Sequence, residues 1–339
     1  MGLFNKFIDK VFGEDGLIDQ FNEKETREER EQFEKAYTDL LQKWRDWVSY
    51  MRSEEDTIKL GEEILGLLEG IDKDKANKRI FSEKKEGSRL FKHSVFGYIS
   101  SNDPIKELGD RITSRVSSII KKRNKFNQFV EELNAIPLVD ISVDTDAIAA
   151  NCSIGDIEEV KTQKVGKQFN KMAKLPNYVV IDVETTGLNP SKNKIIELSA
   201  IRYELGTPVS AFTTYINPCC NIPAKASEIN GIKDDDIKNA PTIEQVSKSF
   251  LDFVGNSSVV GYNVSFDLLF LYSAGIDLIT SRKIYDVLEL ARKAWKDEDS
   301  YKLVDIASGI GVIYPPHESL ADCLATAKVF DEAILEITQ

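Results

Sequence analysis

Residues 179–188 read VVIDVETTGL, and this stretch decides how the C-terminal half of the chain folds. The apolar run at its start is typical of a buried β-strand, in which neighbouring side chains point to opposite faces. The odd-numbered valine and isoleucine side chains therefore share one face, and Asp182 and Glu184 share the other. Two carboxylates at the end of an apolar strand are costly to bury unless a cation neutralises them. A solvated strand end is the alternative that this stretch alone leaves open.

Alternating strands and helices continue from residue 176 to the end of the chain. Short apolar stretches predict strands over residues 178–184, 195–203, 210–216, 258–262 and 283–286. Helical spacing of apolar residues predicts helices over residues 243–254, 266–273, 287–294 and 319–339. Short connections between the first three strands favour an antiparallel meander, and the later strands alternate with helices. We therefore predict an α/β fold with a mixed five-stranded sheet flanked by helices.

Two further segments place acidic residues near predicted helix starts. Asp267 lies in the first turn of the helix after the fourth strand, where capping is the simpler interpretation. His317 and Asp322 are five residues apart, which on one helix is a rotation of roughly 140°. They can share a face only if His317 lies outside the helix. Pro315 and Pro316, which precede His317, favour that arrangement.

Taken together, these segments resemble the DEDDh group of the DnaQ-like 3′–5′ exonuclease superfamily. The pattern Asp-x-Glu-Thr-Thr-Gly-Leu is matched in full by residues 182–188, and His-x-x-x-x-Asp is matched by His317 and Asp322. The pattern His-Asn-x-x-Phe-Asp is matched by residues 262–267, except that Tyr262 stands where histidine is common. The resemblance ends before the N-terminal half of the chain.

The resemblance implies an RNase H-like fold and a metal-dependent exonuclease that releases nucleoside monophosphates from the 3′ end of a nucleic acid. It implies four carboxylates that hold two Mg²⁺ or Mn²⁺ ions: Asp182, Glu184, Asp267 and Asp322. Crowded acids need such cations, and oxygen ligands suit hard divalent ions. By resemblance, His317 is the general base that takes a proton from the attacking water. The residues expected to contact the substrate are Thr185, Thr186, Gly187, Leu188, Asn263 and Phe266.

Composition and charge narrow the class of protein. The 339 residues are 42% hydrophobic and 29% charged, which supports a folded core and excludes a disordered or collagen-like chain. The four cysteines show no CxxC spacing, which favours a reducing, cytoplasmic location, and two histidines are too few for a multi-histidine metal centre. No apolar run is long enough to span a membrane. The net charge is −9 over residues 181–339 and −3 over residues 1–180, so contact with nucleic acid needs metal cations or a local basic patch.

The N-terminal half has a different pattern. Residues 1–137 read as an α-helical domain of unknown role, residues 138–175 as a connector and residues 176–339 as the exonuclease domain. Ser53 is expected to cap one helix, and Pro104 is expected to begin another that stops before Pro137. An amphipathic segment at residues 2–12 could dock on a membrane surface or a partner, although packing on its own domain is the simpler interpretation.

One predicted helix of this region is strongly basic. It carries Arg111, Arg115, Lys121, Lys122, Arg123 and Lys125, and no acidic residue occurs between Asp110 and Glu131. A solvated helix face is the simpler interpretation of such a run. The alternative is a surface that follows a phosphate backbone and guides a 3′ end to the acidic exonuclease domain.

Two other functions stay open at this point. The first is a proofreading subunit of a DNA polymerase, which we expect less because the last predicted helix runs to Gln339 and leaves no C-terminal tail for binding a polymerase. The second is an inactive nucleic-acid-binding or scaffold protein, which we expect less because all five catalytic positions are filled. Single-stranded nucleic acid or 3′ ends are the expected partners, with DNA and RNA both open. A protein partner for the helical domain and the oligomeric state are also left open.

Overall fold

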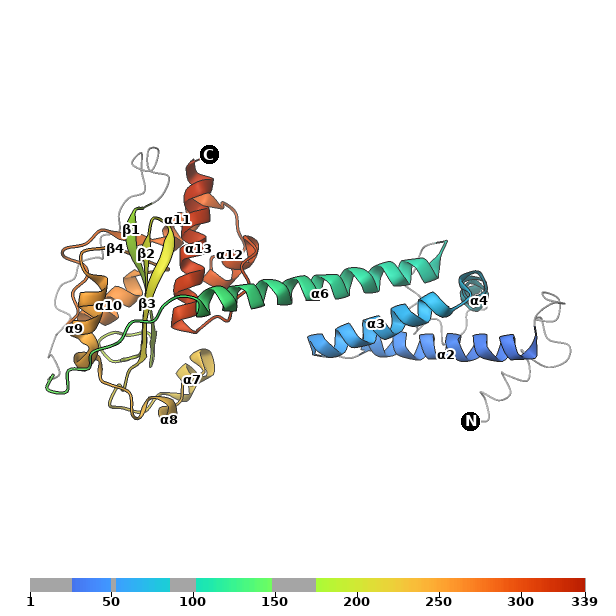
Figure 1. Ribbon diagram of the computed structural model, residues 1–339, viewed down its shortest axis with the longest axis horizontal. Coiled ribbons are helices and arrows are strands. Elements are labelled where there is room, and N and C mark those ends of the chain that lie inside the picture. The colour runs from blue at the N-terminus through green and yellow to red at the C-terminus, as the bar shows by residue number, and fades with distance from the viewer. Residues whose placement is uncertain (1–25, 50–52, 86–101, 148–174, 339) are drawn as a thin grey trace. The chain divides into compact units, whose positions relative to one another are not determined.

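The computed structural model describes residues 26–49, 53–85, 102–147 and 175–338 (Figure 1). The chain divides into a unit that ends at Arg123 and a second unit that begins at Asn124. The amphipathic segment predicted at residues 2–12 lies outside the described residues. Among the helices described, none combines the length and the apolar character needed to cross a membrane.

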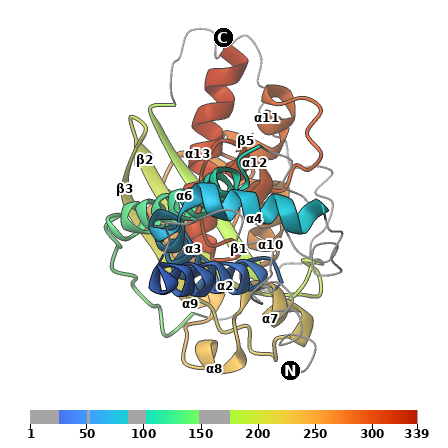
Figure 2. The same ribbon diagram turned by 90° about the vertical axis from the view of Figure 1, so that its right-hand side faces the viewer.

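In the first unit, the described residues form helices and the short turns beside them. The helices are α2 (Arg27–Ser49), α3 (Glu54–Gly70), α4 (Lys73–Lys85) and the first part of α6 (Pro104–Asn134). Helix α4 lies crosswise to the other three at one end of the unit (Figures 1 and 2). The predicted helix starts are confirmed, since Ser53 Oγ accepts the Asp56 N–H at 3.1 Å and Pro104 is the first residue of α6. Gly61 allows helices α3 and α6 to approach closely. A Cβ atom at this position would lie only 2.5 Å from the Val116 side chain.

The second unit contains one five-stranded sheet with the order β3-β2-β1-β4-β5. Its strands are β1 (Asn177–Thr185), β2 (Ile195–Glu204), β3 (Thr207–Tyr215), β4 (Ser258–Gly261) and β5 (Ile284–Asp286). Strands β1, β2 and β3 pair antiparallel, whereas β4 runs parallel to β1 and β5 runs parallel to β4. The predicted mixed five-stranded sheet is therefore confirmed.

Helices cover both faces of this sheet (Figure 1). Helices α9 (Ile243–Val254) and α10 (Ser265–Ser273) lie on one face, and α11 (Val287–Ala294), α12 (Leu303–Gly309) and α13 (Ser319–Thr338) lie on the other. Alternation along β1 sends Val179, Ile181 and Val183 into the core with α9 and α10. Val180 points to the opposite core beneath α13, so Asp182 and Glu184 lie on the α13 side of the sheet.

Two short helices follow β3 that the sequence pattern did not predict. They are α7 (Ala224–Asn230) and α8 (Asp234–Ile237). Both pack on a small core that includes Ile196 of β2 and Ile232. With 7 and 4 residues, they are too short for a helical period to be read from the sequence.

The second unit also takes in residues that precede the expected domain start at 176. Phe129 of α6 is buried in the core with α13, and its ring is tilted against that of Tyr314 with the centroids 5.5 Å apart. Leu138 then forms a parallel bridge with Ala211 of β3, whose carbonyl accepts the Val139 N–H at 2.9 Å. This part of the predicted connector therefore pairs with the outer edge of β3, where a sheet otherwise presents unpaired backbone groups.

Candidate active site

The first two acidic side chains lie at the C-terminal end of β1. Asp182 is paired across the sheet with Ser199 of β2, and Glu184 with Glu197. The pairing register shifts between Glu184 and Thr185, and bulges of this kind change the direction of a strand near functional sites. The strand therefore presents its two carboxylates immediately before it turns away from the sheet.

Asp267 reaches the end of β1 from the neighbouring helix α10. Its side chain is only 3% exposed, and Oδ1 accepts the Val183 N–H at 3.0 Å. Val183 lies between Asp182 and Glu184, so this hydrogen bond fixes the third carboxylate beside the first two. The bond crosses from α10 to β1, which goes beyond the local capping that the sequence suggested for Asp267.

Asp322 and His317 come from the start of α13. His317 precedes the helix, in the loop, and its backbone has a positive φ of 66°. The His317 N–H donates to Asp322 Oδ2 at 2.9 Å, and the Tyr314 hydroxyl donates to Asp322 Oδ1 at 2.7 Å. Both carboxylate oxygens are therefore fixed, and the histidine is turned back beside the carboxylate as the sequence spacing requires.

These elements bring potential metal ligands together. Ligand atoms of Glu184, His317 and Asp322 all lie within 4.8 Å of one another. Asp182 lies within electrostatic reach of Asp267, Asp322 and Glu184. Carboxylate oxygens and an imidazole nitrogen are donors that divalent cations accept, so the residues present fit a divalent metal site.

Burial makes the negative charge of this cluster costly. Burial, and after it the charges of Asp267 and Asp322, raises the pKa of Asp182 well above its usual value. Burial and the Asp322 charge raise the pKa of Glu184 to about 8. Burial also raises the pKa of Asp267 to about 8, although the hydrogen bond from Val183 opposes the change. All of these carboxylates can be ionised together near neutral pH only if cations neutralise them.

The structure adds two residues that the sequence did not single out. Glu197 is half-buried opposite Glu184, and burial raises the pKa of its carboxyl. Asn230, the last residue of α7, forms a hydrogen bond with Glu184 and accepts the Ile232 N–H at 3.1 Å. An acid within the apolar run of β2 was the available signal for Glu197, but its position opposite Glu184 depends on a strand register that the sequence does not specify.

The predicted substrate contacts in the turn after β1 differ from one another in how far they are buried. Thr185 and Thr186 are buried, and the Thr185 hydroxyl donates to the Gly187 carbonyl at 2.8 Å, so they shape the turn. A Cβ on Gly187 would lie 2.7 Å from the Asn193 side chain, which explains the glycine. Leu188, in contrast, is 85% exposed just beyond the carboxylates.

The other two predicted contacts and Tyr262 follow β4. Asn263 is exposed with a positive φ of 54°, and its N–H donates to Asp286 at 3.0 Å. Phe266 is half-buried and packs on Phe270, with ring centroids 4.8 Å apart. The Tyr262 hydroxyl donates to the Tyr301 carbonyl at 2.7 Å.

Known proteins match this half of the chain. An exonuclease family of the RNase T type matches residues 179–330. DNA polymerase III subunit epsilon of Aquifex aeolicus is 33% identical over 165 residues, which cover 47% of this chain and 81% of that protein. The chain belongs to the RNase T/DnaQ-like exonuclease family. The predicted family resemblance is therefore confirmed, and the second unit is a DnaQ-like 3′–5′ exonuclease domain homologous to polymerase proofreading domains.

Other members of the family are much longer than the matched region. A PolC-type DNA polymerase III of Clostridium perfringens is 36% identical over 155 residues, and the 3′-5′ exonuclease DinG of Bacillus subtilis is 32% identical over 168 residues. The match covers 45% and 48% of this chain but only 11% and 18% of those proteins. Among solved structures, exonuclease X in complex with 5′ overhanging duplex DNA is 24% identical with a TM-score of 0.40, covering 47% of this chain and 91% of that one.

Proposed function

We propose that the protein is a DEDDh-type 3′–5′ exonuclease that removes nucleoside monophosphates from the 3′ end of single-stranded nucleic acid. The observation that carries this proposal is the convergence of Asp182, Glu184, Asp267 and Asp322 beside His317. These five residues come from β1, from α10, and from the start of α13 with the loop before it. An inactive scaffold would have no need to keep this costly cluster of buried acids.

The four carboxylates are the proposed ligands for Mg²⁺ or Mn²⁺, with two ions at the site. Bound ions of this kind neutralise the carboxylates, activate water and stabilise negative charge on a phosphate that is being cleaved. The hydrogen bond from Val183 orients Asp267, and those from Tyr314 and His317 orient Asp322. Ligands that are fixed in this way need little rearrangement when the substrate arrives.

His317 is the proposed general base. Its side chain is exposed, so it can take a proton from the attacking water at an imidazole nitrogen and pass it to solvent. Its backbone is anchored to Asp322, which limits how far the ring can move from the carboxylates. The role requires a neutral imidazole, because only a ring nitrogen that carries no proton can accept one from the water.

The turn after β1 is the proposed binding site for the terminal nucleotide. Leu188 follows the carboxylates of β1 in the chain and offers an exposed apolar side chain that can lie against the face of a base. Such contacts do not distinguish one base from another, which suits an exonuclease that acts on strands of any sequence. Thr185, Thr186 and Gly187 would present backbone groups to the nucleotide, and Asn263 and Phe266 would contact it from the α10 side.

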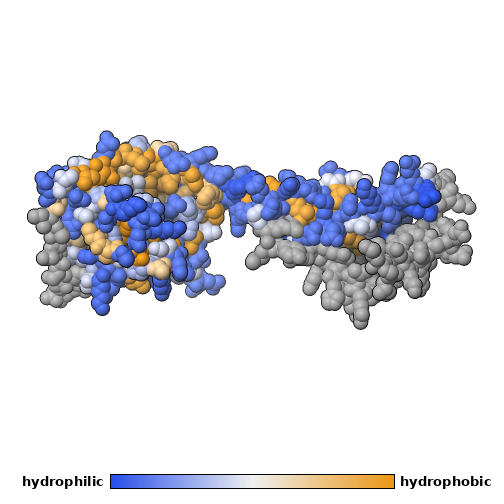
Figure 3. Space-filling view, turned by 90° about the horizontal axis from the view of Figure 1, so that it is seen from below, coloured by the Kyte–Doolittle hydropathy of each residue, from blue (hydrophilic) through white to orange (hydrophobic). Residues whose placement is uncertain are grey.

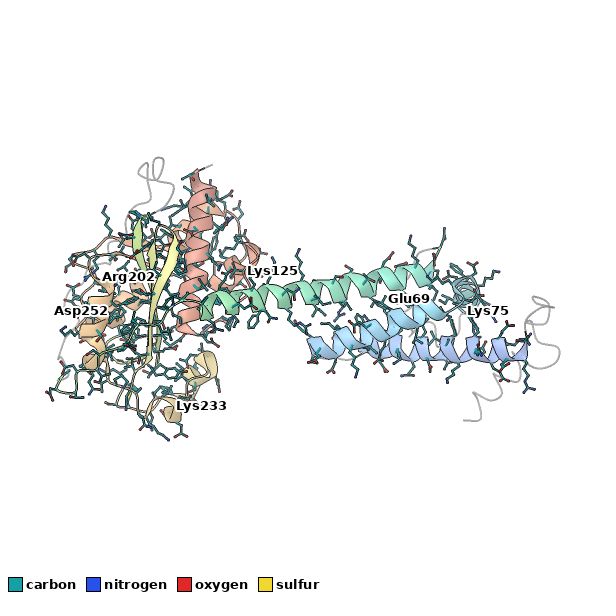
Figure 4. The ribbon with its side chains drawn as sticks, viewed as in Figure 1. Glu69, Lys75, Lys125, Arg202, Lys233 and Asp252 are labelled. Carbon is teal, nitrogen blue, oxygen red and sulfur yellow. The ribbon has the colours of Figure 1, made fainter. Side chains whose placement is uncertain are left out.

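We also propose that the basic part of α6 binds the phosphate backbone of longer strands. Lys121, Lys122 and Arg123 are exposed, and Figure 3 shows hydrophilic residues along this stretch. Lys125, which the sequence grouped with them, is half-buried (Figure 4). Its Nζ lies so close to Gly311 that a Cβ there would be 2.5 Å away. Lys125 is therefore left out of the proposed binding surface.

The direct test uses the intact protein with DNA and RNA single strands of matched sequence, in the presence of Mg²⁺, Mn²⁺ or EDTA. We expect mononucleotides to be released in the presence of either ion and not in EDTA, and the ratio of the two rates identifies the preferred substrate. If neither strand is degraded with either ion, the proposed activity is wrong.

Proofreading is a second candidate function. The match to 81% of the length of the polymerase subunit epsilon from Aquifex aeolicus favours it. A proofreading enzyme should degrade a mispaired 3′ end of a primer faster than a paired one, because an unpaired end reaches the active site more readily. Equal rates on paired ends, mispaired ends and free single strands would favour a general exonuclease.

A further inference from the structure

A small polar network connects the middle of the sheet to the first residue of α13. Glu197 Oε2 accepts the Ser319 N–H at 3.3 Å, and the hydroxyls of Ser199 and Ser319 are hydrogen-bonded at 2.5 Å. Ser199 is also hydrogen-bonded to Thr213 of β3 at 2.8 Å. Ser199 and Ser319 are both fully buried. We refer to Glu197, Ser199 and Ser319 as the β2–α13 clamp.

The clamp supplies the cap that α13 needs. The first N–H groups of a helix have no partner within the helix, and a nearby acceptor must satisfy them. In α13 this acceptor is Glu197, which precedes Ser319 by 122 residues. A carboxylate at this position is also favoured by the helix dipole. The start of α13 is thereby fixed to β2, the strand that lies beside the catalytic carboxylates of β1.

In the sequence, Ser319 lies between two residues of the proposed active site. His317 comes two residues before Ser319, and Asp322 comes three residues after it. The same turn is closed by the hydrogen bond from the His317 N–H to Asp322 and by the one from the Asp322 N–H to the Glu318 carbonyl at 2.9 Å. A shift of the α13 start would therefore move His317 and Asp322 together relative to Glu184 and Asp182.

We propose that Glu197 is a positioning residue of this exonuclease. It holds the first turn of α13 against β2, so that Asp322 and His317 face the carboxylates of β1. The role depends on the hydrogen bond that Glu197 accepts, rather than on contact with the substrate or the ions. This inference rests on the proposed function, because the geometry that Glu197 maintains is that of the proposed metal site.

The experiment compares Glu197→Ala with Glu197→Gln in the intact protein. Glutamine has the same shape and keeps an oxygen that can accept the Ser319 N–H, whereas alanine leaves that group without its partner. Loss of such a supporting contact typically costs about 10–100-fold in metal affinity or activity. We expect Glu197→Ala to lower kcat in this range with little change in KM, and to weaken Mn²⁺ binding measured by calorimetry. Glu197→Gln should restore most of both.

Glu204→Ala is the matched control, because Glu204 lies exposed at the other end of the same strand. Its activity and Mn²⁺ affinity should remain those of the wild type. The proposal is overturned if Glu197→Ala behaves like this control, or if Glu197→Gln is as defective as Glu197→Ala. The second result would mean that the charge of Glu197 acts directly at the site.

Two further measurements apply if Glu197→Ala does not fold or if the wild type shows no hydrolysis. If Glu197→Ala does not fold by circular dichroism, Ser199→Ala takes its place, since it removes the other hydrogen bond to Ser319. It should lower kcat and Mn²⁺ affinity, and unchanged values would overturn the clamp. If the wild type binds Mn²⁺ but hydrolyses no nucleic acid, the proposed function fails, and the calorimetric comparison of the variants still tests the role of Glu197.

Discussion

The two units differ most in what they bury. Among the described residues, the helical unit buries apolar side chains with Thr57 as an exception, and its charged groups stay near the surface. The exonuclease unit buries Asp267, Asp322, Ser199 and Ser319 in addition to its apolar core. Burying polar groups costs stability unless they are paired, so a fold retains them where they have a task. The difference agrees with placing the proposed active site in the exonuclease unit.

The largest expected effect comes from removing a carboxylate of the site. Asp182→Ala, Glu184→Ala, Asp267→Ala and Asp322→Ala should each lower hydrolysis by roughly 10³-fold or more, because residues of one metal site act as a unit. The metal-free Asp182→Ala variant should remain folded and be at least as thermally stable as the wild type, since one of the crowded acids has been removed. Near wild-type turnover in any variant would remove that residue from the site.

Removing the proposed base should have the next largest effect. His317→Ala should lower kcat by about 10²–10⁴-fold, the usual contribution of a general base. Mn²⁺ affinity, measured by calorimetry, should change little, because the base is not a ligand in this mechanism. The alternative follows from the short distances among Glu184, His317 and Asp322. If Mn²⁺ affinity collapses in His317→Ala, the histidine is a metal ligand and another group accepts the proton.

The buried acids predict that stability depends on pH, and that metal ions reverse the dependence. Glu184 and Asp267 have pKa values raised to about 8, so their protonated forms stabilise the metal-free fold. This contribution is complete below the ordinary carboxyl pKa near 4 and is lost as the pH rises through about 8. The melting temperature of the metal-free protein should therefore fall between pH 6 and pH 9, by about 2–4 °C for each kcal/mol lost.

Mg²⁺ should oppose this fall, because it binds the ionised carboxylates and stabilises the fold that holds them. Asp267→Asn is the matched variant, since it keeps an oxygen that can accept the Val183 N–H without the charge. Its melting temperature should fall less between the two pH values. A wild-type melting temperature that rises over this range in EDTA would contradict the assigned burial of the cluster.

The smallest expected effect tests the helical unit. Changing Lys121, Lys122 and Arg123 to glutamine should weaken binding of long strands and reduce the slope of log affinity against log salt by about 2. Hydrolysis of a dinucleotide should not change, because such a short substrate need not reach this part of α6. Equal effects on long and short substrates, or no effect on either, would leave this stretch as a solvated helix face.

The sequence predicted helices and strands better than it predicted contacts between segments that are distant in the chain. The strands and the longer helices were predicted because their apolar residues recur with a clear period, and β1 is continuous enough to show which face carries Asp182 and Glu184. The position of His317 outside α13 followed from the helical angle between it and Asp322. Glu197 and Asn230 could not be predicted, because their contacts with Ser319 and Glu184 join segments whose register is set only by tertiary packing. The same reason explains why Lys125 was grouped with exposed lysines although its Nζ packs against Gly311.

The 3′–5′ exonuclease activity is tested most directly by a time course on a 5′-labelled single strand with Mg²⁺, comparing the wild type with Asp182→Ala. We expect the wild type to give a ladder of labelled products that shorten one nucleotide at a time from the 3′ end, with nucleoside monophosphates released, and Asp182→Ala to give no products. Immediate release of the labelled 5′ nucleotide, internal cleavage, or equal hydrolysis by the wild type and Asp182→Ala would contradict the proposed activity.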